Sequence, residues 1–144
     1  MIRIIRKFEL EDIACVYDLG IQIPQFSAND SGKHVFWPKD TLERFVRHGF
    51  SFVIESETDL VGFLLAVYQP VTRKLTWENM YILPEYRKKG LAEECFQQSW
   101  KLAQEQGATI AEGLVESHNL QAQSMCKKLG FHDAGDYHWM LTFL

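Results

Sequence analysis

The stretch that decides the fold runs Trp77-Glu78-Asn79-Met80-Tyr81-Ile82-Leu83-Pro84-Glu85-Tyr86-Arg87-Lys88-Lys89-Gly90-Leu91-Ala92. A strand-like segment ends at Leu83, Pro84 closes it, and a short basic loop leads to Gly90, where a helical pattern begins. The first turn of a helix leaves backbone N–H groups unpaired, and the helix dipole adds partial positive charge there. Because Gly90 has no Cβ and residues 87–89 are all cationic, the stretch predicts an anion site suited to a pyrophosphate.

The local string has a second interpretation, in which Arg-Lys-Lys-Gly is a solvated loop before an ordinary helix. Two better-known phosphate motifs are excluded. A P-loop requires GxxxxGK followed by Ser or Thr, and a dinucleotide fingerprint requires GxGxxG, and neither is present. The rest of the chain therefore has to decide between the two interpretations.

Strand-like and helix-like patterns surround the stretch. We expect strands over residues 2–8, 50–55, 60–68, 74–83 and 108–116 and from Phe131 to the C-terminus, with helices over 10–20, from 40 onward, over 90–106 and over 119–128. Short turns join the three middle strands, so these are expected to pair antiparallel, whereas the strand–helix–strand order after residue 74 predicts a parallel pair. The expected fold class is α/β (α+β), with a mixed, mostly antiparallel central sheet and helices on both faces.

Length and composition favour a single domain over residues 1–144. A chain of 144 residues buries roughly 70% of its unfolded surface, so it needs neither a metal nor a disulfide to hold it together. Apolar residues make up 47% of the chain and aromatic residues 13%, which argues against disorder.

Charge and cysteine content exclude several classes of protein. The net charge of −4 argues against nucleic-acid partners, which require a basic face, and mildly favours a cationic partner. Cys15, Cys95 and Cys126 form no CxxC pair, so neither a zinc site nor a disulfide framework is expected. Residues 1–7 are too few and too charged for a signal peptide, and no apolar run approaches the ~20 residues of a membrane helix. We expect a cytoplasmic protein with no metal, no membrane contact and no nucleic-acid partner.

Two blocks of sequence in register resemble the GNAT family, the GCN5-related N-acetyltransferases. Residues 81–92 look like the central motif of that family, (R/Q)xxGx(G/A), behind a strand that ends in proline. The second block looks like the family's N-x-x-A…LGF helix and comprises Asn119, Ala122, Leu129, Gly130 and Phe131. One helix and one strand are expected between the blocks, as in the family, and the order of elements is similar from Ile2 to about Phe131.

The resemblance implies an acetyl-CoA site at the end of the strand before the motif. In the family this strand splays from the next parallel strand, and the coenzyme lies in the gap. By similarity, Met80, Tyr81 and Ile82 offer backbone groups to the pantetheine arm and the acetyl carbonyl. Lys88, Lys89, Gly90, Leu91 and Ala92 are expected around the pyrophosphate, with Arg87 opening the loop. Asn119 is expected to hydrogen-bond the pantetheine arm; the alternative is a plain helix N-cap, and both roles can coexist.

The implied reaction moves an acetyl group to an amine, which must be neutral to attack the thioester. Glu78 is the candidate general base, since the family often places a carboxylate on this strand and since apolar neighbours raise a carboxyl pKa. The alternative is a carboxylate that binds a cationic substrate or faces solvent. Ribosomal-protein N-terminal acetylases instead carry a glutamate on the next strand. Leu114 stands there in this chain, which weakens a peptide N-terminus as the acceptor, although Glu112 and Glu116 share its parity and one of them could face the cleft.

The leaving thiolate of CoA needs a proton or a hydrogen bond. Many members carry a tyrosine directly before the K-x-L-G-F stretch, and this chain has Cys126 there. A thiol is only a weak donor, and Cys126 also lies on an apolar helical stripe, so a small core residue is the alternative. Tyr81 or Tyr137 could replace it, or the thiolate could leave unassisted.

The acceptor is expected to be a small-molecule or peptide amine, held largely by residues 21–37. Phe26, Phe36 and Trp37 could wall a pocket or pack in the core, and Asp30 or Glu78 could attract an ammonium. Only 14 residues follow Gly130, which leaves either an unusually open acceptor cleft or one completed by a second subunit in a homodimer. The alternatives to an amine acetyltransferase are a non-catalytic CoA sensor and a transferase for another acyl group.

Overall fold

The computed structural model of the chain describes residues 3–23, 36–138 and 140. It divides into two compact units, Met1–Leu114 and Val115–Leu144, and each is described by itself. A single domain over residues 1–144 stays a prediction.

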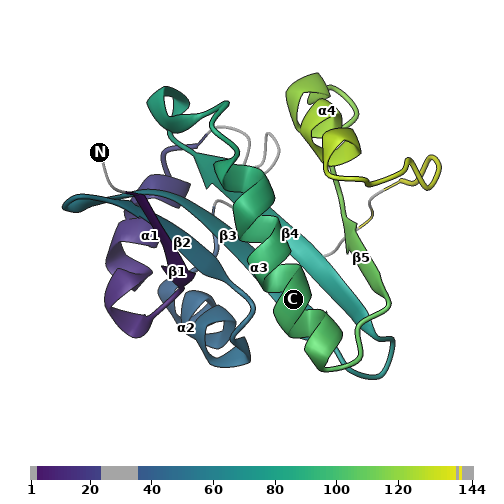
Figure 1. The fold of residues 1–144 in the computed structure, drawn as a ribbon, viewed down its shortest axis with the longest axis horizontal. Coiled ribbons are helices and arrows are strands. Elements are labelled where there is room, and N and C mark those ends of the chain that lie inside the picture. Colours follow the sequence, from purple (N-terminus) through teal and green to yellow (C-terminus); the bar gives the residue numbers. More distant parts are fainter. Residues whose placement is uncertain (1–2, 24–35, 139, 141–144) are drawn as a thin grey trace. The chain divides into compact units, whose positions relative to one another are not determined.

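The first unit is built on a five-stranded sheet with the strand order β1-β2-β3-β4-β5 (Figure 1). Its strands are β1 (Arg3–Lys7), β2 (Phe52–Ser56), β3 (Asp59–Gln69), β4 (Lys74–Ile82) and β5 (Ile110–Gly113). The first four strands pair antiparallel, and β5 runs parallel to β4 after a crossover through a helix. The predicted mixed, mostly antiparallel sheet is therefore confirmed.

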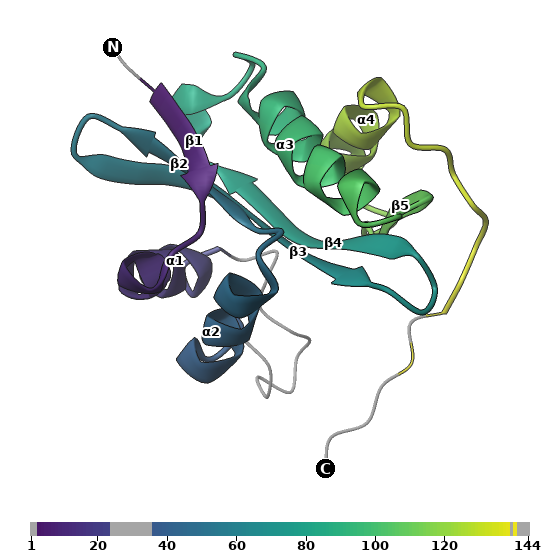
Figure 2. The ribbon, with the colours of Figure 1, turned by 60° about the horizontal axis from the view of Figure 1, so that its bottom comes forward.

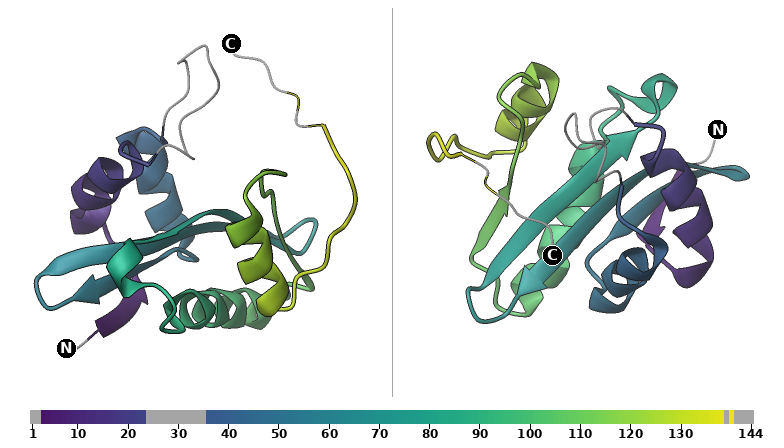
Figure 3. Two further views of the ribbon diagram at one scale, coloured as in Figure 1. Left: turned by 90° about the horizontal axis from the view of Figure 1, so that it is seen from above. Right: turned by 180° about the vertical axis from the view of Figure 1, so that it is seen from behind.

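Helices cover both faces of this sheet, as the left view of Figure 3 shows. One face carries α1 (Ile13–Gly20) and α2 (Lys39–His48), and the other carries α3 (Leu91–Glu105). Two short 3-10 helices, η1 (Leu10–Asp12) and η3 (Pro84–Tyr86), lead into α1 and into the loop before α3. The same division into faces is visible in Figure 2. The second unit contains α4 (Leu120–Lys128).

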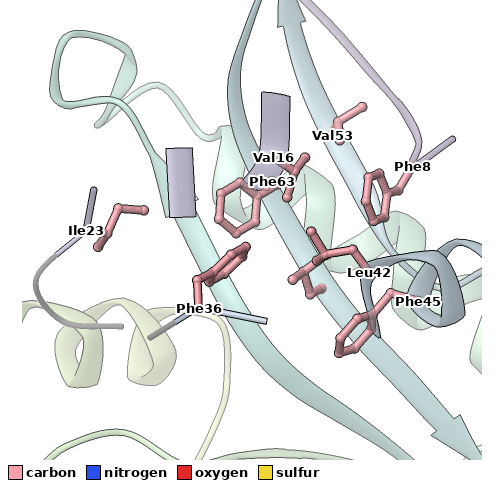
Figure 4. Packing of buried hydrophobic residues seen from close by; sticks show 9 residues of the cluster. Phe8, Val16, Ile23, Phe36, Leu42, Phe45, Val53 and Phe63 are labelled. Atoms are coloured by element: carbon pink, nitrogen blue, oxygen red, sulfur yellow. The ribbon is translucent and has the colours of Figure 1, made fainter. Parts of the chain in front are cut away.

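The long strand β3 has a separate hydrophobic core on each face. Phe63 and Leu65 face α1 and α2 in a cluster that is completed by Phe8, Val16, Ile23, Phe36, Leu42, Phe45 and Val53 (Figure 4). Ala66 and Tyr68 face α3, in a cluster with Leu75 and Ala103. This two-sided burial explains why residues 60–68 form a nearly continuous apolar run rather than an alternating one.

The predicted last strand is wrong for residues 131–138, which form no strand. Asp133 accepts a hydrogen bond from the backbone N–H of Gly135 at 2.9 Å, and Gly135 has a φ of +122°. This side-chain turn diverts the backbone from an extended course, because the φ of Gly135 is far from the strand region. Residues 139 and 141–144 lie outside the described part of the chain.

Candidate active site

Strands β4 and β5 are paired over only part of the length of β4, and beyond that part they separate. Their register extends from Lys74 to Trp77 on β4, with Gly113 opposite Trp77 as the last pair. Residues 78–82 of β4 have no partner on β5, and the two ribbons are seen to separate in the right view of Figure 3. Gly113 allows the close approach, since a Cβ there would lie 3.1 Å from the Trp77 carbonyl oxygen. The splay expected at the cofactor site is thus present.

A β-bulge lies directly after this branch point, at Glu78. Ala66 of β3 is opposite Trp77 and Leu65 is opposite Asn79, so Glu78 is the extra residue on β4. Bulges of this kind occur often beside active sites, because they redirect a side chain. Trp77 stacks on Phe96 of α3, with ring centroids 5.6 Å apart, whereas Asn79 lies on the opposite face, which carries α1 and α2. The normal alternation of side chains along β4 is therefore interrupted at Glu78, the candidate general base.

The carboxyl group of Glu78 has an altered acidity. Its pKa is raised, chiefly because protein atoms displace water from the carboxyl and further because the charge of Glu112 repels it, although the residue as a whole is exposed. Glu112 on β5 is opposite Thr76 in the register, and its Oε2 lies 3.5 Å from Lys74 Nζ. A raised pKa moves a carboxylate toward the range in which it can act as a general base.

The loop that follows η3 has an open, cationic end. Lys88 and Gly90 both adopt left-handed backbone conformations, with φ of +60° and +77°. Gly90 is the N-cap of α3 and has no side chain with which to cap the helix. Among the described residues, no atom lies within 4 Å of a Cβ built at Gly90, so a ligand can approach the backbone there. Lys88, Lys89 and Gly90 are exposed, whereas Leu91 is buried. Uncapped N–H groups beside two lysines fit a diphosphate.

Arg87 ties this loop to the end of β4. Its Nε donates to the carbonyl oxygen of Ile82 at 2.7 Å, and its guanidinium lies 5.3 Å from the ring centroid of Tyr81. Tyr81 in turn packs against Phe63, with ring centroids 6.4 Å apart. The sequence predicted that Arg87 opens the loop but gave no sign of these contacts, which fix the strand edge relative to the helix N-terminus. Met80 is half-buried on the same edge.

Asn119 and Cys126 belong to the second unit. Asn119 Oδ1 accepts the backbone N–H of Ala122 at 3.1 Å, so the N-cap interpretation is confirmed, and its contact with pantetheine stays a prediction. Cys126 is half-buried, and burial raises the pKa of its thiol. The thiol is therefore protonated at neutral pH.

Residues of the expected acceptor region divide between the core and the site. Phe36 is 6% exposed and packs on Phe63, with ring centroids 5.6 Å apart, so it is a core residue rather than a pocket wall. Trp37 donates its indole N–H to Asn79 Oδ1 at 2.5 Å. Phe26 and Asp30 lie outside the described residues. Completion of the cleft by a second subunit stays a prediction.

Asn79 lies next to the candidate base, and the sequence did not indicate its contact with Trp37. Its partner Trp37 is 42 residues away in the chain. The sequence placed Trp37 in the acceptor region, but no local pattern indicates its contact with Asn79, which depends on the packing of the chain against the sheet.

Within residues 3–23, 36–138 and 140, no group of three or more His, Cys, Asp or Glu side chains is placed to hold a metal ion. No helix in the same residues is both long enough and apolar enough to cross a membrane. A metal-free, cytoplasmic protein stays a prediction.

The comparison with known families settles the family. The model of the acetyltransferase (GNAT) family matches residues 16–131, a range that contains the splay, the basic loop and the helix cap at Asn119. The chain belongs to the GNAT family. The two motif blocks predicted this assignment correctly. A search of curated proteins finds no significant match.

Solved GNAT structures share the fold at low sequence identity. The aminoglycoside acetyltransferase AAC(6')-Iy, in complex with a CoA bisubstrate analog, has a TM-score of 0.79 at 16% identity over 100% of both chains. Ard1 from Thermoplasma volcanium has a TM-score of 0.73 at 19% identity, covering 94% of this chain and 86% of that one. The ribosomal-protein-S18-alanine N-acetyltransferase from Escherichia coli has a TM-score of 0.71 at 17% identity over 93% and 80%. Since an aminoglycoside N-acetyltransferase and a ribosomal-protein N-acetyltransferase share the fold, the fold does not identify the acceptor.

Proposed function

We propose that this GNAT protein transfers the acetyl group of acetyl-CoA to a primary amine of a small molecule. The observation that carries the proposal is the branch of β4 from β5 next to the uncapped N-terminus of α3, with Glu78 at the branch point. Membership of an acetyltransferase family supports the donor, and AAC(6')-Iy, a protein of the same fold, has been solved with CoA. Aminoglycoside acetyltransferases among the structures of this fold supply the first acceptors to try.

The proposed donor site uses backbone groups for both ends of acetyl-CoA. The first-turn N–H groups of α3, with Lys88 and Lys89, hold the diphosphate. The backbone of Met80, Tyr81 and Ile82, which lies beyond the last residue of β4 that pairs with β5, binds the pantetheine arm and donates to the acetyl carbonyl oxygen. These N–H donors stabilise the negative charge that develops there during attack.

The proposed reaction is a direct transfer. The carboxylate of Glu78, directly or through a water, takes a proton from the ammonium of the acceptor. The neutral amine then attacks the thioester carbon, and the new C–N bond gives a tetrahedral intermediate. The nitrogen of this intermediate loses its second proton to water, the C–S bond breaks, and CoA leaves as its thiolate. Cys126 is the candidate donor of a proton to this thiolate, since its thiol is protonated at neutral pH. A Cys126→Ala variant with unchanged kcat would assign that proton to solvent.

An acceptor screen with mass spectrometry of the products tests the proposal. The panel contains aminoglycosides, polyamines, free amino acids and peptides with free N-termini, and the release of CoA thiol is followed for each. We expect a product with a mass gain of one acetyl group for at least one small amine. Tight CoA binding without turnover on any acceptor would instead indicate a sensor, for which the cysteine in place of the family's tyrosine is the observation in favour. Faster turnover with longer acyl donors would indicate a different acyltransferase.

A further inference from the structure

Trp37 forms a hydrogen bond with the residue next to the candidate base. Its indole N–H donates to Asn79 Oδ1 at 2.5 Å, and its ring packs on Phe45 of α2 with centroids 5.8 Å apart. Both Trp37 and Asn79 are half-buried. The bond joins the segment just before α2 to β4, across 42 residues of sequence.

This bond can form only when the bulge on β4 stays where it is. Asn79 is opposite Leu65, whose side chain lies in the cluster under α1 and α2, and directly opposed residues share a face. Trp37 packs against the same cluster. If the bulge moved one residue toward the end of β4, the side chain of Asn79 would turn to the α3 face and its hydrogen bond with Trp37 would break. A register shift of one residue moves a side chain to the opposite face of the sheet.

We propose that Trp37 is a positioning residue for Glu78, and that its bond to Asn79 holds the β4 bulge at Glu78 so that the carboxylate faces the acceptor beside Glu112. The catalytic part of this inference rests on the proposed acetyl transfer. The structural part, the placement of the Glu78 carboxyl, can be measured without any reaction.

The charges that face Glu78 are few among the residues that the structure describes. Glu112 of β5 repels its carboxylate, and Lys74 of β4 lies against Glu112. A bulge that loosens would let the Glu78 carboxyl move toward water and away from Glu112. Its pKa would then fall toward the ordinary value for a glutamate.

Trp37→Phe removes the indole N–H but keeps an aromatic ring against Phe45. We expect the pKa of Glu78, measured by carbon-13 NMR of its carboxyl group, to fall in this variant. With an accepted amine, kcat is expected to fall roughly tenfold or more, since small misplacements of catalytic groups are costly. The KM for acetyl-CoA is expected to stay within about twofold, because the diphosphate site is built from α3. Trp100→Phe, on the α3 face, is the matched control and is expected to change neither quantity.

Asn79→Leu removes the acceptor of the same bond and leaves the ring of Trp37 on Phe45. The double variant is expected to have a Glu78 pKa and a kcat no lower than those of either single variant, because both substitutions break the same hydrogen bond. If Trp37→Phe does not fold, Asn79→Leu carries the test. A Glu78 pKa that stays at its wild-type value in the folded variants would overturn the inference, whatever the activity. Failure of the wild-type protein to acetylate any amine would refute the proposed reaction and leave this NMR test intact.

Discussion

At the scale of single residues, the proposed chemistry depends on the carboxylate of Glu78. We expect Glu78→Gln to lower kcat/KM for the amine by ~10²-fold or more at neutral pH, since general-base catalysis contributes about that much. CoA affinity, measured by calorimetry, is expected to be unchanged. Glu85→Gln, an exposed change in η3, is the control. Full activity of Glu78→Gln would remove Glu78 from the mechanism.

Glu112 sets part of the acidity of the base. The pKa of Glu78 is raised first by burial and second by the charge of Glu112, so Glu112→Gln lowers it. A general base works only when deprotonated, and therefore the acidic limb of the pH profile of kcat/KM is expected to move to lower pH. The profile is measured with one amine for the wild type, Glu112→Gln and the exposed control Glu105→Gln. A limb that moves to higher pH would contradict the repulsion of the Glu78 carboxylate by Glu112.

Asp12 is expected to make stability depend on pH. Burial alone would raise the pKa of its carboxyl, but hydrogen bonds from Arg6 at 2.8 and 2.9 Å and from the Glu9 N–H at 2.9 Å outweigh burial and lower it. A lowered folded-state pKa stabilises the protein above the unfolded value near ~3.9, and this contribution is lost as pH falls through the folded-state pKa.

The Asp12 contribution can be measured by urea unfolding at several pH values. Asp12→Asn is expected to cost about 1–3 kcal/mol at neutral pH and to weaken the loss of stability in acid. Glu43→Gln breaks the exposed pair with Arg47 and is expected to cost under ~0.5 kcal/mol. Equal losses of unfolding free energy in the two variants would show that burial does not strengthen the interactions of Asp12.

At the scale of elements, the N-terminus of α3 is expected to carry coenzyme affinity. Gly90→Glu places a negative charge on the proposed diphosphate site and is expected to abolish CoA binding, measured by calorimetry, in a protein with an unchanged circular dichroism spectrum. Gly90→Ala is expected to weaken binding and to cost roughly 1–2 kcal/mol of stability, because φ is positive there.

The matched control is Gly49→Ala at the end of α2. Gly49 has a φ of +83°, and an added Cβ would have only Lys7 Nζ nearby, at 4.0 Å. The backbone strain is therefore similar at both glycines, while only Gly90 adjoins the proposed site. Equal CoA affinity in the two alanine variants would contradict the placement of the diphosphate.

Periodicity and turn residues predicted most elements of this GNAT fold. The run over 60–68, the Leu83-Pro84 boundary and Gly90 are local signals, and each marks a feature that the structure contains. Phe131 was misleading, because its apolar character favoured a strand while the Asp133–Gly135 turn decided the backbone.

Within the candidate site, the basic loop could be predicted, but the contacts that organise it could not. Arg87 reaches back to Ile82, and Trp37 crosses 42 residues to Asn79. The bulge at Glu78 arises from how β3 and β4 align, and a pairing register is a property of two strands that neither strand's pattern specifies here.

At the scale of the whole molecule, coenzyme binding is expected to raise the melting temperature. A ligand at about 100 times its Kd stabilises the folded state by ~2.7 kcal/mol, which corresponds to roughly 8 °C for a chain of this size. Differential scanning fluorimetry with increasing CoA measures the shift, and Gly90→Glu is the control that is expected to show none. An equal shift in that variant would place the coenzyme elsewhere.

The separation of β4 from β5 also affects how the purified protein is expected to behave in solution. Within the part of the chain that the structure describes, residues 78–82 leave one row of backbone groups without a partner strand on the β5 side. Such a bare edge is a template on which foreign polypeptide can add, and it favours aggregation. A coenzyme lying along that edge would shield it, so preparations stripped of CoA are best kept dilute, and purification in the presence of CoA is expected to give the better-behaved sample.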